Sequence, residues 1–205
     1  MKSKNWSLAT RFLHVGLVLT VSTQLFISLV MEEPGDKQSI LGGAMFEAHE
    51  IVGLTALVIV LIHWGWSVFS QADGGLANLF PWDKEGRQQV NKDIKGLVKL
   101  QLPEGGVRGG VPGLVHGLGL LAVTGIALTG GVLFLFYPEH GDPGVLVEGF
   151  EEAHEILATF VWTYWMGHAG IAVLHHLLGH EYVKKMFTFS DKKTQKYAVS
   201  ADARK

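Results

Sequence analysis

Residues 153–178 read AHEILATFVWTYWMGHAGIAVLHHLL, an apolar stretch that contains a single carboxylate, Glu155, and four histidines. A helix needs about 20 apolar residues to cross the roughly 30 Å of hydrocarbon in a bilayer, so this stretch is long enough to span a membrane. A histidine at membrane depth is costly and usually has a functional partner. We therefore expect a membrane-spanning helix in which some histidines bind another group.

Three further stretches of the chain have a similar length and apolar character. They cover about 8 to 31, 49 to 70 and 113 to 136. With 153–178 they predict an all-α integral membrane protein, a four-helix antiparallel bundle in which residues 1–205 form a single domain. The first stretch follows basic residues, as a signal peptide does, but it continues through Val30 without a small-residue cleavage site. We expect it to be a helix of the mature protein.

Basic residues are concentrated on one predicted side of the membrane. Lys and Arg occur in the N-terminal segment, in the loop from 71 to 112 and in the C-terminal tail, whereas the loop after the first span holds only Lys37 and the loop after the third span holds none. By the positive-inside rule, both termini and the middle loop are predicted to be cytoplasmic in a bacterial inner membrane. The opposite side is acidic, with the carboxylates Glu32, Glu33, Asp36, Glu47, Glu139, Asp142, Glu148, Glu151 and Glu152.

The middle loop has a helical pattern of its own. Between residues 83 and 100, apolar side chains recur at steps of three and four residues, with lysines on the other faces. This spacing predicts a short amphipathic helix on the inner membrane surface; a solvated charged loop is the alternative. The glycine pairs at 105–106 and 109–110 lack the Lys and Ser or Thr that follow a phosphate-binding loop. The basic C-terminal tail has few aromatic residues, so its expected contacts are lipid headgroups or neighbouring subunits rather than nucleic acid.

The two halves of the chain resemble each other around their histidines. The sequence FEAHEI around His49 is echoed by EAHEI around His154. Each of these histidines is followed fourteen residues later by another, His63 or His168. This pattern indicates a duplicated helical hairpin. Fourteen residues are close to four helical turns, so the two histidines of each helix share a face and lie about 21 Å apart along its axis.

This spacing allows two facing helices to hold two cofactors, one near each membrane surface. The chain has no cysteine, which excludes thiolate metal sites, iron–sulfur clusters and covalent c-type haem attachment. Histidine is a common axial ligand of haem iron. Some histidines at such positions are structural or interfacial, but six in a repeated register favour haem: His14, His49, His63, His116, His154 and His168.

Small residues accompany these histidines. Gly53 lies one turn beyond His49 on the same face, and Gly167 and Gly170 flank His168. Small residues let a flat ligand approach a helix backbone closely, which favours a porphyrin over a bare metal ion. The many glycines of the third span are equally typical of ordinary helix packing in membranes.

Together these residues resemble the prokaryotic cytochrome b561 family, whose broader group includes the membrane cytochrome b subunits of nickel–iron hydrogenases and formate dehydrogenases. The resemblance covers nearly the whole chain and rests on His14, on His49 followed by Gly53, on His116, and on the series His154, His168, His175 and His176. It implies transmembrane electron transfer through b-type haems, two in number, with a quinone as a further possible ligand. It assigns no catalytic residue.

The family pattern also implies which histidines bind iron. His49 and His154 would bind the haem nearer the outside, and His14 and His168 the haem nearer the cytoplasm. Depth agrees for the outer pair, because we expect both histidines in the first turn of helices that enter from that side. The inner pair is open, since His63 lies at the depth of His14 and can also face His168. Family members often have an arginine at the position of His63.

His63 and His116 exceed the four ligands that two haems require. They can hydrogen-bond a propionate or a quinone. If the two halves are related by a pseudo-twofold axis, they can instead face each other and hold a third haem. His175 lies two turns below His168 on the same face, where it can meet a propionate or can be a solvated interfacial side chain.

Haem iron with both axial positions filled has no open site for a substrate. We therefore expect an electron carrier that links a quinone pool to a periplasmic redox protein such as a c-type cytochrome. One alternative is a superoxide:quinone oxidoreductase, although acidic outer loops would repel an anionic substrate. Another is a haem-bearing membrane anchor for a periplasmic dehydrogenase or hydrogenase.

Overall fold

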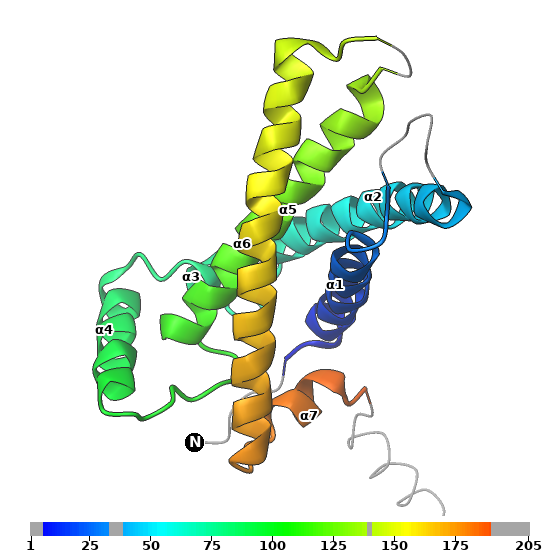
Figure 1. The fold of residues 1–205 in the computed structure, drawn as a ribbon. Helices are drawn as coiled ribbons and strands as arrows, with labels where there is room; N and C mark the ends of the chain where they lie inside the picture. The colour runs from blue at the N-terminus through cyan, green and yellow to red at the C-terminus, as the bar shows by residue number, and fades with distance from the viewer. Residues whose placement is uncertain (1–5, 33–38, 139–140, 190–205) are drawn as a thin grey trace, which may run out of the picture.

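The computed structural model describes residues 6–32, 39–138 and 141–189, and these ranges contain helices but no strands. The helices are α1 (Leu8–Ile27), α2 (Ile40–Phe69), α3 (Gly75–Leu79), α4 (Lys84–Val98), α5 (Gly110–Phe136), α6 (Gly144–Leu177) and α7 (Tyr182–Phe187). Four of them, α1, α2, α5 and α6, are long and apolar enough to cross a membrane (Figure 1). The predicted all-α fold with four membrane-spanning helices is confirmed.

Two of the spanning helices begin earlier than their predicted spans. α2 begins at Ile40, nine residues before His49, and α6 begins at Gly144, ten residues before His154. The Ser39 hydroxyl caps α2 by accepting the Gly42 N–H at 3.0 Å. The expectation that both histidines lie in the first turn of their helices is therefore wrong. An apolar stretch marks the depth of the membrane, whereas the helix continues through the polar residues before it.

The bundle is held together by close contact between consecutive helices. α1 packs on α2, α2 on α5, and α5 on α6, which runs upright through Figure 1 with α5 beside it. Val60 of α2 and Leu120 and Val123 of α5 form the buried core. Glycine makes the α5–α6 contact possible, because a Cβ at Gly119 would overlap the ring of Tyr164.

Large side chains, rather than closely packed backbones, join α6 to α1. Phe26 of α1 makes edge contacts with Trp162 and Trp165 of α6, with ring centroids 5.9 and 5.8 Å apart. The Trp165 indole N–H also donates to the Ser22 hydroxyl at 2.9 Å. α6 therefore stands further from α1 than from α5, a spacing that suits a planar group between the helices.

The predicted helix in the middle loop is present as α4. It is fixed to the start of α5 by Asp93, which is buried, forms an ion pair with Arg108 and accepts the Val111 N–H at 3.0 Å. Burial raises the pKa of Asp93, but the hydrogen bonds from Arg108, Val111 and Gln89 and the positive charge of Arg108 outweigh this effect and hold that pKa below its usual range.

The apolar side chains of α4 face away from this attachment. Ile94, Leu97 and Val98 are exposed, although they are the residues whose spacing predicted the helix. Such a face, bordered by lysines, is typical of a helix that lies on a membrane surface. Its position on the inner surface stays a prediction.

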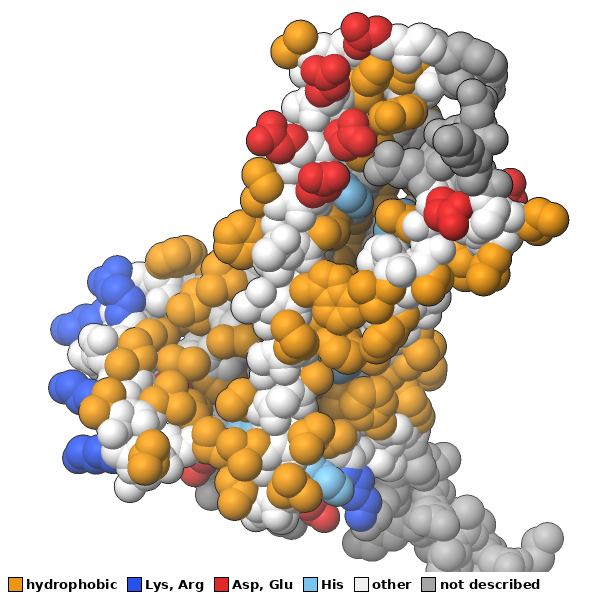
Figure 2. Space-filling view, viewed as in Figure 1, with side chains coloured by type: hydrophobic (Ala, Val, Ile, Leu, Met, Phe, Trp, Pro, Cys, Tyr) orange, Lys and Arg blue, Asp and Glu red, His pale blue; other side chains and the backbone are white. Residues whose placement is uncertain are grey.

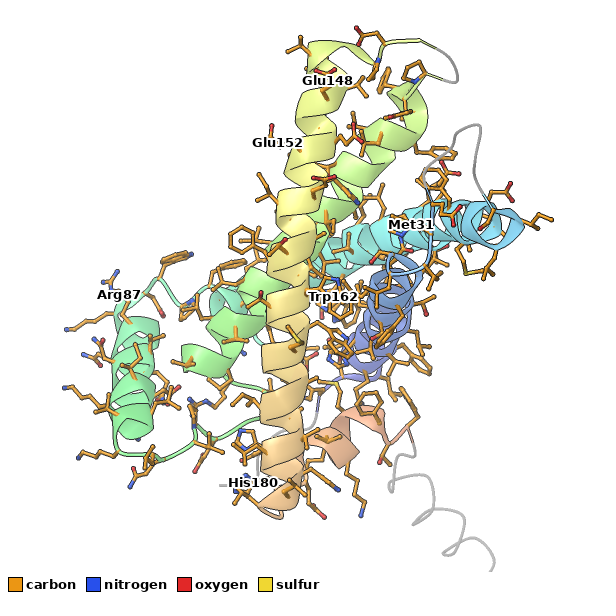
Figure 3. All side chains as sticks on the ribbon, in the orientation of Figure 1. Met31, Arg87, Glu148, Glu152, Trp162 and His180 are labelled. Atoms are coloured by element: carbon orange, nitrogen blue, oxygen red, sulfur yellow. The ribbon has the colours of Figure 1, made fainter. Side chains whose placement is uncertain are left out.

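Charge divides the molecule into two ends, which we call the acidic end and the basic end. Figure 2 shows carboxylates over the start of α6 and basic side chains over α4. In Figure 3, Glu148 and Glu152 lie toward one end of α6 and His180 toward the other, while Arg87 lies on α4, to the side of the spanning helices. The predicted asymmetry is therefore present in the fold. Glu33, Asp36 and Glu139 lie outside the described residues.

Candidate functional site

The first pair of facing histidines lies toward the acidic end. The rings of His49 from α2 and His154 from α6 have centroids 6.3 Å apart, and their planes make an angle of 75°. His49 has a buried Nδ1 without a hydrogen-bond partner. The duplicated sequence segments are thus brought together across the bundle, as their register predicted.

The tautomer of His154 is set by Thr129 of α5. The Thr129 hydroxyl lies 3.0 Å from the carbonyl oxygen of Ile126, to which it donates, and 2.9 Å from His154 Nδ1. Because this hydroxyl has one hydrogen, it accepts a hydrogen bond from Nδ1–H. The lone pair of His154 is then on Nε2, the state in which an imidazole binds a metal. A Cβ at Gly130 would lie 3.0 Å from His154 Cε1, so the small residue lets the ring rest against α5.

Gly53 makes room for a neighbouring side chain. A Cβ there would lie 2.6 Å from Gln24 Nε2, and that amide donates to the backbone carbonyl of His49 at 2.8 Å. Gln24 thereby joins α1 to the turn of α2 that carries His49. Contact of Gly53 with a cofactor stays a prediction.

The second pair lies toward the basic end. The rings of His14 from α1 and His168 from α6 have centroids 6.3 Å apart, with planes at 59°. His14 also has a buried Nδ1 without a hydrogen-bond partner. Tyr164 stacks on His168 with centroids 5.5 Å apart, and Phe187 of α7 makes an edge contact with His14 at 6.0 Å. α7 therefore covers this pair from the basic end.

His116 and His63 complete a cluster at the same depth. The centroid of the His116 ring lies 5.2 Å from that of the His168 ring, whereas His63 Nδ1 lies 3.2 Å from the Ser67 hydroxyl oxygen. Both line a cavity of about 40 Å³. Its polar lining also includes Thr10, Ser70, Asp73, Asn78 and Arg108.

Ring separation distinguishes these pairs as candidate metal ligands. Two imidazoles that bind one metal ion from opposite sides have centroids about 6.3 Å apart, given a metal–nitrogen distance of about 2.0 Å and about 1.15 Å from nitrogen to ring centre. The pairs His49–His154 and His14–His168 both have this separation. At 5.2 Å, the rings of His116 and His168 are about 1 Å too close. The residues present therefore fit two bis-histidine haems.

An apolar groove lies between α1 and α2 near the basic-end pair. It has a volume of about 620 Å³ and is lined by Phe12, Leu13, Ile62, Gly65, Trp66 and Phe69, with Ala9 and Ser70 at its edges. Trp66 and Ser70 also line the polar cavity beside His63, so the groove and the cavity adjoin. An apolar groove beside polar groups suits a ligand with an apolar tail and a polar head.

His175 has a histidine partner at the end of α6. Its Nδ1 lies 2.8 Å from His180 Nδ1, so one ring donates to the other. His175 is buried, whereas His176 and His180 are exposed. A fully solvated His175 is therefore wrong, while its interfacial position and its contact with a propionate stay predictions.

Three residues of this region were not found from sequence. Thr129 and Arg11 act through contacts with segments that are distant in the chain, whereas Tyr164 stacks on His168 of its own helix. Arg11 and Tyr164 each share a helical face with a histidine about one turn further along the chain, His14 and His168, whereas no sequence signal links Thr129 to His154. Such a shared face is common by chance in an apolar helix.

A family model described as prokaryotic cytochrome b561 matches residues 5–189. This range includes all the histidines described above and the four spanning helices. No curated protein and no solved structure matches the chain. The family implies a b-type haem and haem-mediated electron transfer across a membrane. The chain therefore belongs to the prokaryotic cytochrome b561 family and is a multi-pass membrane cytochrome.

Proposed function

We propose that this protein carries electrons between a quinone in the membrane and a redox protein on the far side, using two bis-histidine b-type haems. His49 and His154 hold the haem toward the acidic end, and His14 and His168 hold the haem toward the basic end. The observation that supports this assignment is the shared ring separation of 6.3 Å in two pairs that lie fourteen residues apart along α6.

Each haem, when bound, supplies an iron that takes up and releases one electron. The four histidines of the two pairs would hold these irons through their imidazoles, with Thr129 orienting His154 and Tyr164 stacking on His168. Trp162 and Trp165, which lie between His154 and His168 along α6, make edge contacts with each other and with Phe26 of α1. The pairs lie about 21 Å apart along α6, which covers most of the roughly 30 Å hydrocarbon layer.

The basic end is assigned to the cytoplasm by the positive-inside rule, which places both termini there. The absence of cysteine makes this assignment simple to test. Cysteine introduced as Glu152→Cys should react with a membrane-impermeant maleimide in intact cells, whereas Arg87→Cys should react only after the membrane is permeabilised. Labelling with the opposite preference would invert the topology.

The groove between α1 and α2 is the proposed quinone site. Its apolar lining suits an isoprenoid tail, and Trp66 and Ser70 lead from it to the polar cavity beside His63. The cavity has room for water, which can carry protons between the quinone and the aqueous phase. Gly65→Leu should fill the groove and slow quinone reduction or quinol oxidation without loss of haem, while Gly149→Leu, an exposed change at the acidic end, should not. Equal rates in both variants would place the quinone elsewhere.

The acidic end is the proposed docking surface for a basic redox protein, such as a c-type cytochrome. Carboxylates crowd the start of α6 (Figure 2). Glu151 and Glu152 lie within one turn of His154 in the chain, so a docked partner comes close to the acidic-end haem. Such a field increases the association rate of a cationic partner and decreases that of an anion.

The same field disfavours the superoxide:quinone alternative, because superoxide is an anion. The membrane-anchor alternative differs from the proposed electron carrier in one measurable property. If the protein were an anchor, a dehydrogenase or hydrogenase subunit would co-purify with it in mild detergent. An electron carrier instead exchanges electrons with its partner in second-order encounters.

Alanine variants test the ligand assignment. His49→Ala or His154→Ala should remove the acidic-end haem and leave the basic-end haem visible in the reduced-minus-oxidised spectrum. His176→Ala is the matched control, since His176 is exposed and belongs to neither pair. If folded His49→Ala protein retains two bis-histidine haems, the acidic-end pair is wrong.

A further inference from the structure

Arg11 of α1 is a buried cation without a carboxylate partner among the described residues. Its residue is 7% exposed. One guanidinium nitrogen, Nη1, donates to the Thr188 carbonyl just after α7, and the buried Nε has no hydrogen-bond partner. Within the described ranges, Arg11 forms no salt bridge with a carboxylate.

This arrangement is costly unless an anion completes it. A buried charge requires a partner, and the guanidinium offers a planar fork of donors that matches a carboxylate. Asp73 does not supply that carboxylate, because its oxygens accept from the Ser7 N–H, the Ser7 hydroxyl and the Thr10 hydroxyl. The free donor of Arg11 therefore fits an acidic group that is not part of the described chain.

The position of Arg11 relates it to the basic-end histidine pair. It precedes His14 by three residues, so the two side chains lie on the same face of α1. The segment at α7 covers both, since Phe187 contacts the His14 ring and Thr188 accepts from Arg11. Arg11 also lies on the side of His14 that is nearer the basic end, where a carboxylate attached to a buried group would reach toward water.

We infer that Arg11 binds a propionate carboxylate of the haem held by His14 and His168; this inference rests on the proposed function. Haem b carries two propionates, and an ionised propionate within a protein needs a cationic or polar partner. The ion pair anchors this haem. It also raises the midpoint potential of this haem, because a positive charge near the iron favours the reduced state, which carries one positive charge fewer.

The test compares Arg11→Gln with Arg87→Gln, a matched loss of an exposed arginine on α4. Purified proteins are titrated potentiometrically, and haem transfer to excess apomyoglobin is timed. In Arg11→Gln, one of the two haem midpoint potentials should fall. One haem should also leave the protein about tenfold to a hundredfold faster, which corresponds to the loss of a charge-assisted hydrogen bond worth about 1.5–3 kcal/mol. Arg87→Gln should match the wild type. Unchanged potentials and loss rates in Arg11→Gln would overturn the inference.

A second measurement identifies the anion. With haem dimethyl ester in place of haem b, the wild type and Arg11→Gln should lose the basic-end haem at equal rates, because the carboxylate is blocked. If Arg11→Gln still accelerates the loss of the ester, Arg11 acts through a lipid phosphate or through packing and the inference is wrong. If Arg11→Gln does not fold, Arg11→Lys should show the faster loss with haem b alone, and an unchanged rate overturns the inference. A wild type without haem would instead refute the proposed function.

Discussion

Replacing Thr129 by valine should weaken the binding of one haem and leave the other intact. Valine keeps the shape of threonine but removes the oxygen that accepts from His154 Nδ1 at 2.9 Å. Loss of such a partner behind a metal ligand typically lowers metal affinity 10- to 100-fold, or about 1.4–2.7 kcal/mol. The His154 ring also rests against α5 at Gly130, so part of its orientation persists. We therefore expect the lower figure, about tenfold.

The assay is the rate of haem transfer from the detergent-solubilised protein to excess apomyoglobin, followed at two wavelengths that distinguish the haems. The basic-end haem is the internal control. Thr55→Val is the external control, because the Thr55 hydroxyl is exposed on α2 and bonds only to the Ile51 carbonyl of its own helix. If Thr129→Val releases both haems at wild-type rates, or releases both equally fast, Thr129 does not orient a ligand of the acidic-end haem.

Three further predictions concern the other regions. His14→Ala should remove the basic-end haem, whereas His63→Ala should retain it in the absorption spectrum; the reverse order would assign the ligand to α2. Asp93→Asn should lower the thermal midpoint of unfolding at neutral pH. The difference from wild type should shrink as the pH falls below about 4 and through the lowered pKa of Asp93, because the carboxylate stabilises the fold only when it is ionised. A difference that does not depend on pH would contradict this prediction. The double variant Glu151→Gln/Glu152→Gln should slow electron transfer to a basic c-type cytochrome. It should also weaken the salt dependence of the rate near 0.1 M, where the Debye length is about 10 Å. A rate that responds neither to salt nor to these substitutions would exclude docking at this surface.

The spans and the histidine pairs were predictable because both depend on local periodicity. Apolar length identifies a helix that crosses a membrane, and a spacing of fourteen residues places His154 and His168 on one face whatever surrounds them. The facing of His49 and His154 was allowed by the duplicated spacing and implied by the family resemblance. Thus the family, the fold class and the pair His49–His154 were available before the structure, whereas the partner of His168 was left open.

The sequence did not decide which histidine pairs with His168, because three histidines lie at its depth on three different helices. Only the rotation of each helix about its axis determines which ring faces it, and that rotation is set by packing at positions such as Gly119. The structure brings both His14 and His116 against His168, at 6.3 and 5.2 Å. The ring separation then favours His14.

The short helices α3 and α7 and the starts of α2 and α6 were missed for a related reason. Helices of five or six residues are stabilised by their neighbours rather than by their own sequence. Gly117 of α5, for example, lies where a Cβ would overlap the Leu79 carbonyl at the end of α3. The polar starts of α2 and α6 lack the apolar pattern on which span prediction depends.

The number of haems per chain tests the central claim most directly. Quantitative pyridine haemochrome analysis of the purified protein, divided by protein concentration from amino-acid analysis, should give two b-type haems per chain, one for each histidine pair with a ring separation of 6.3 Å. Three haems would show that His63 and His116 form a further pair. One haem, or no reducible b-type spectrum, would contradict the assignment of both pairs as haem ligands.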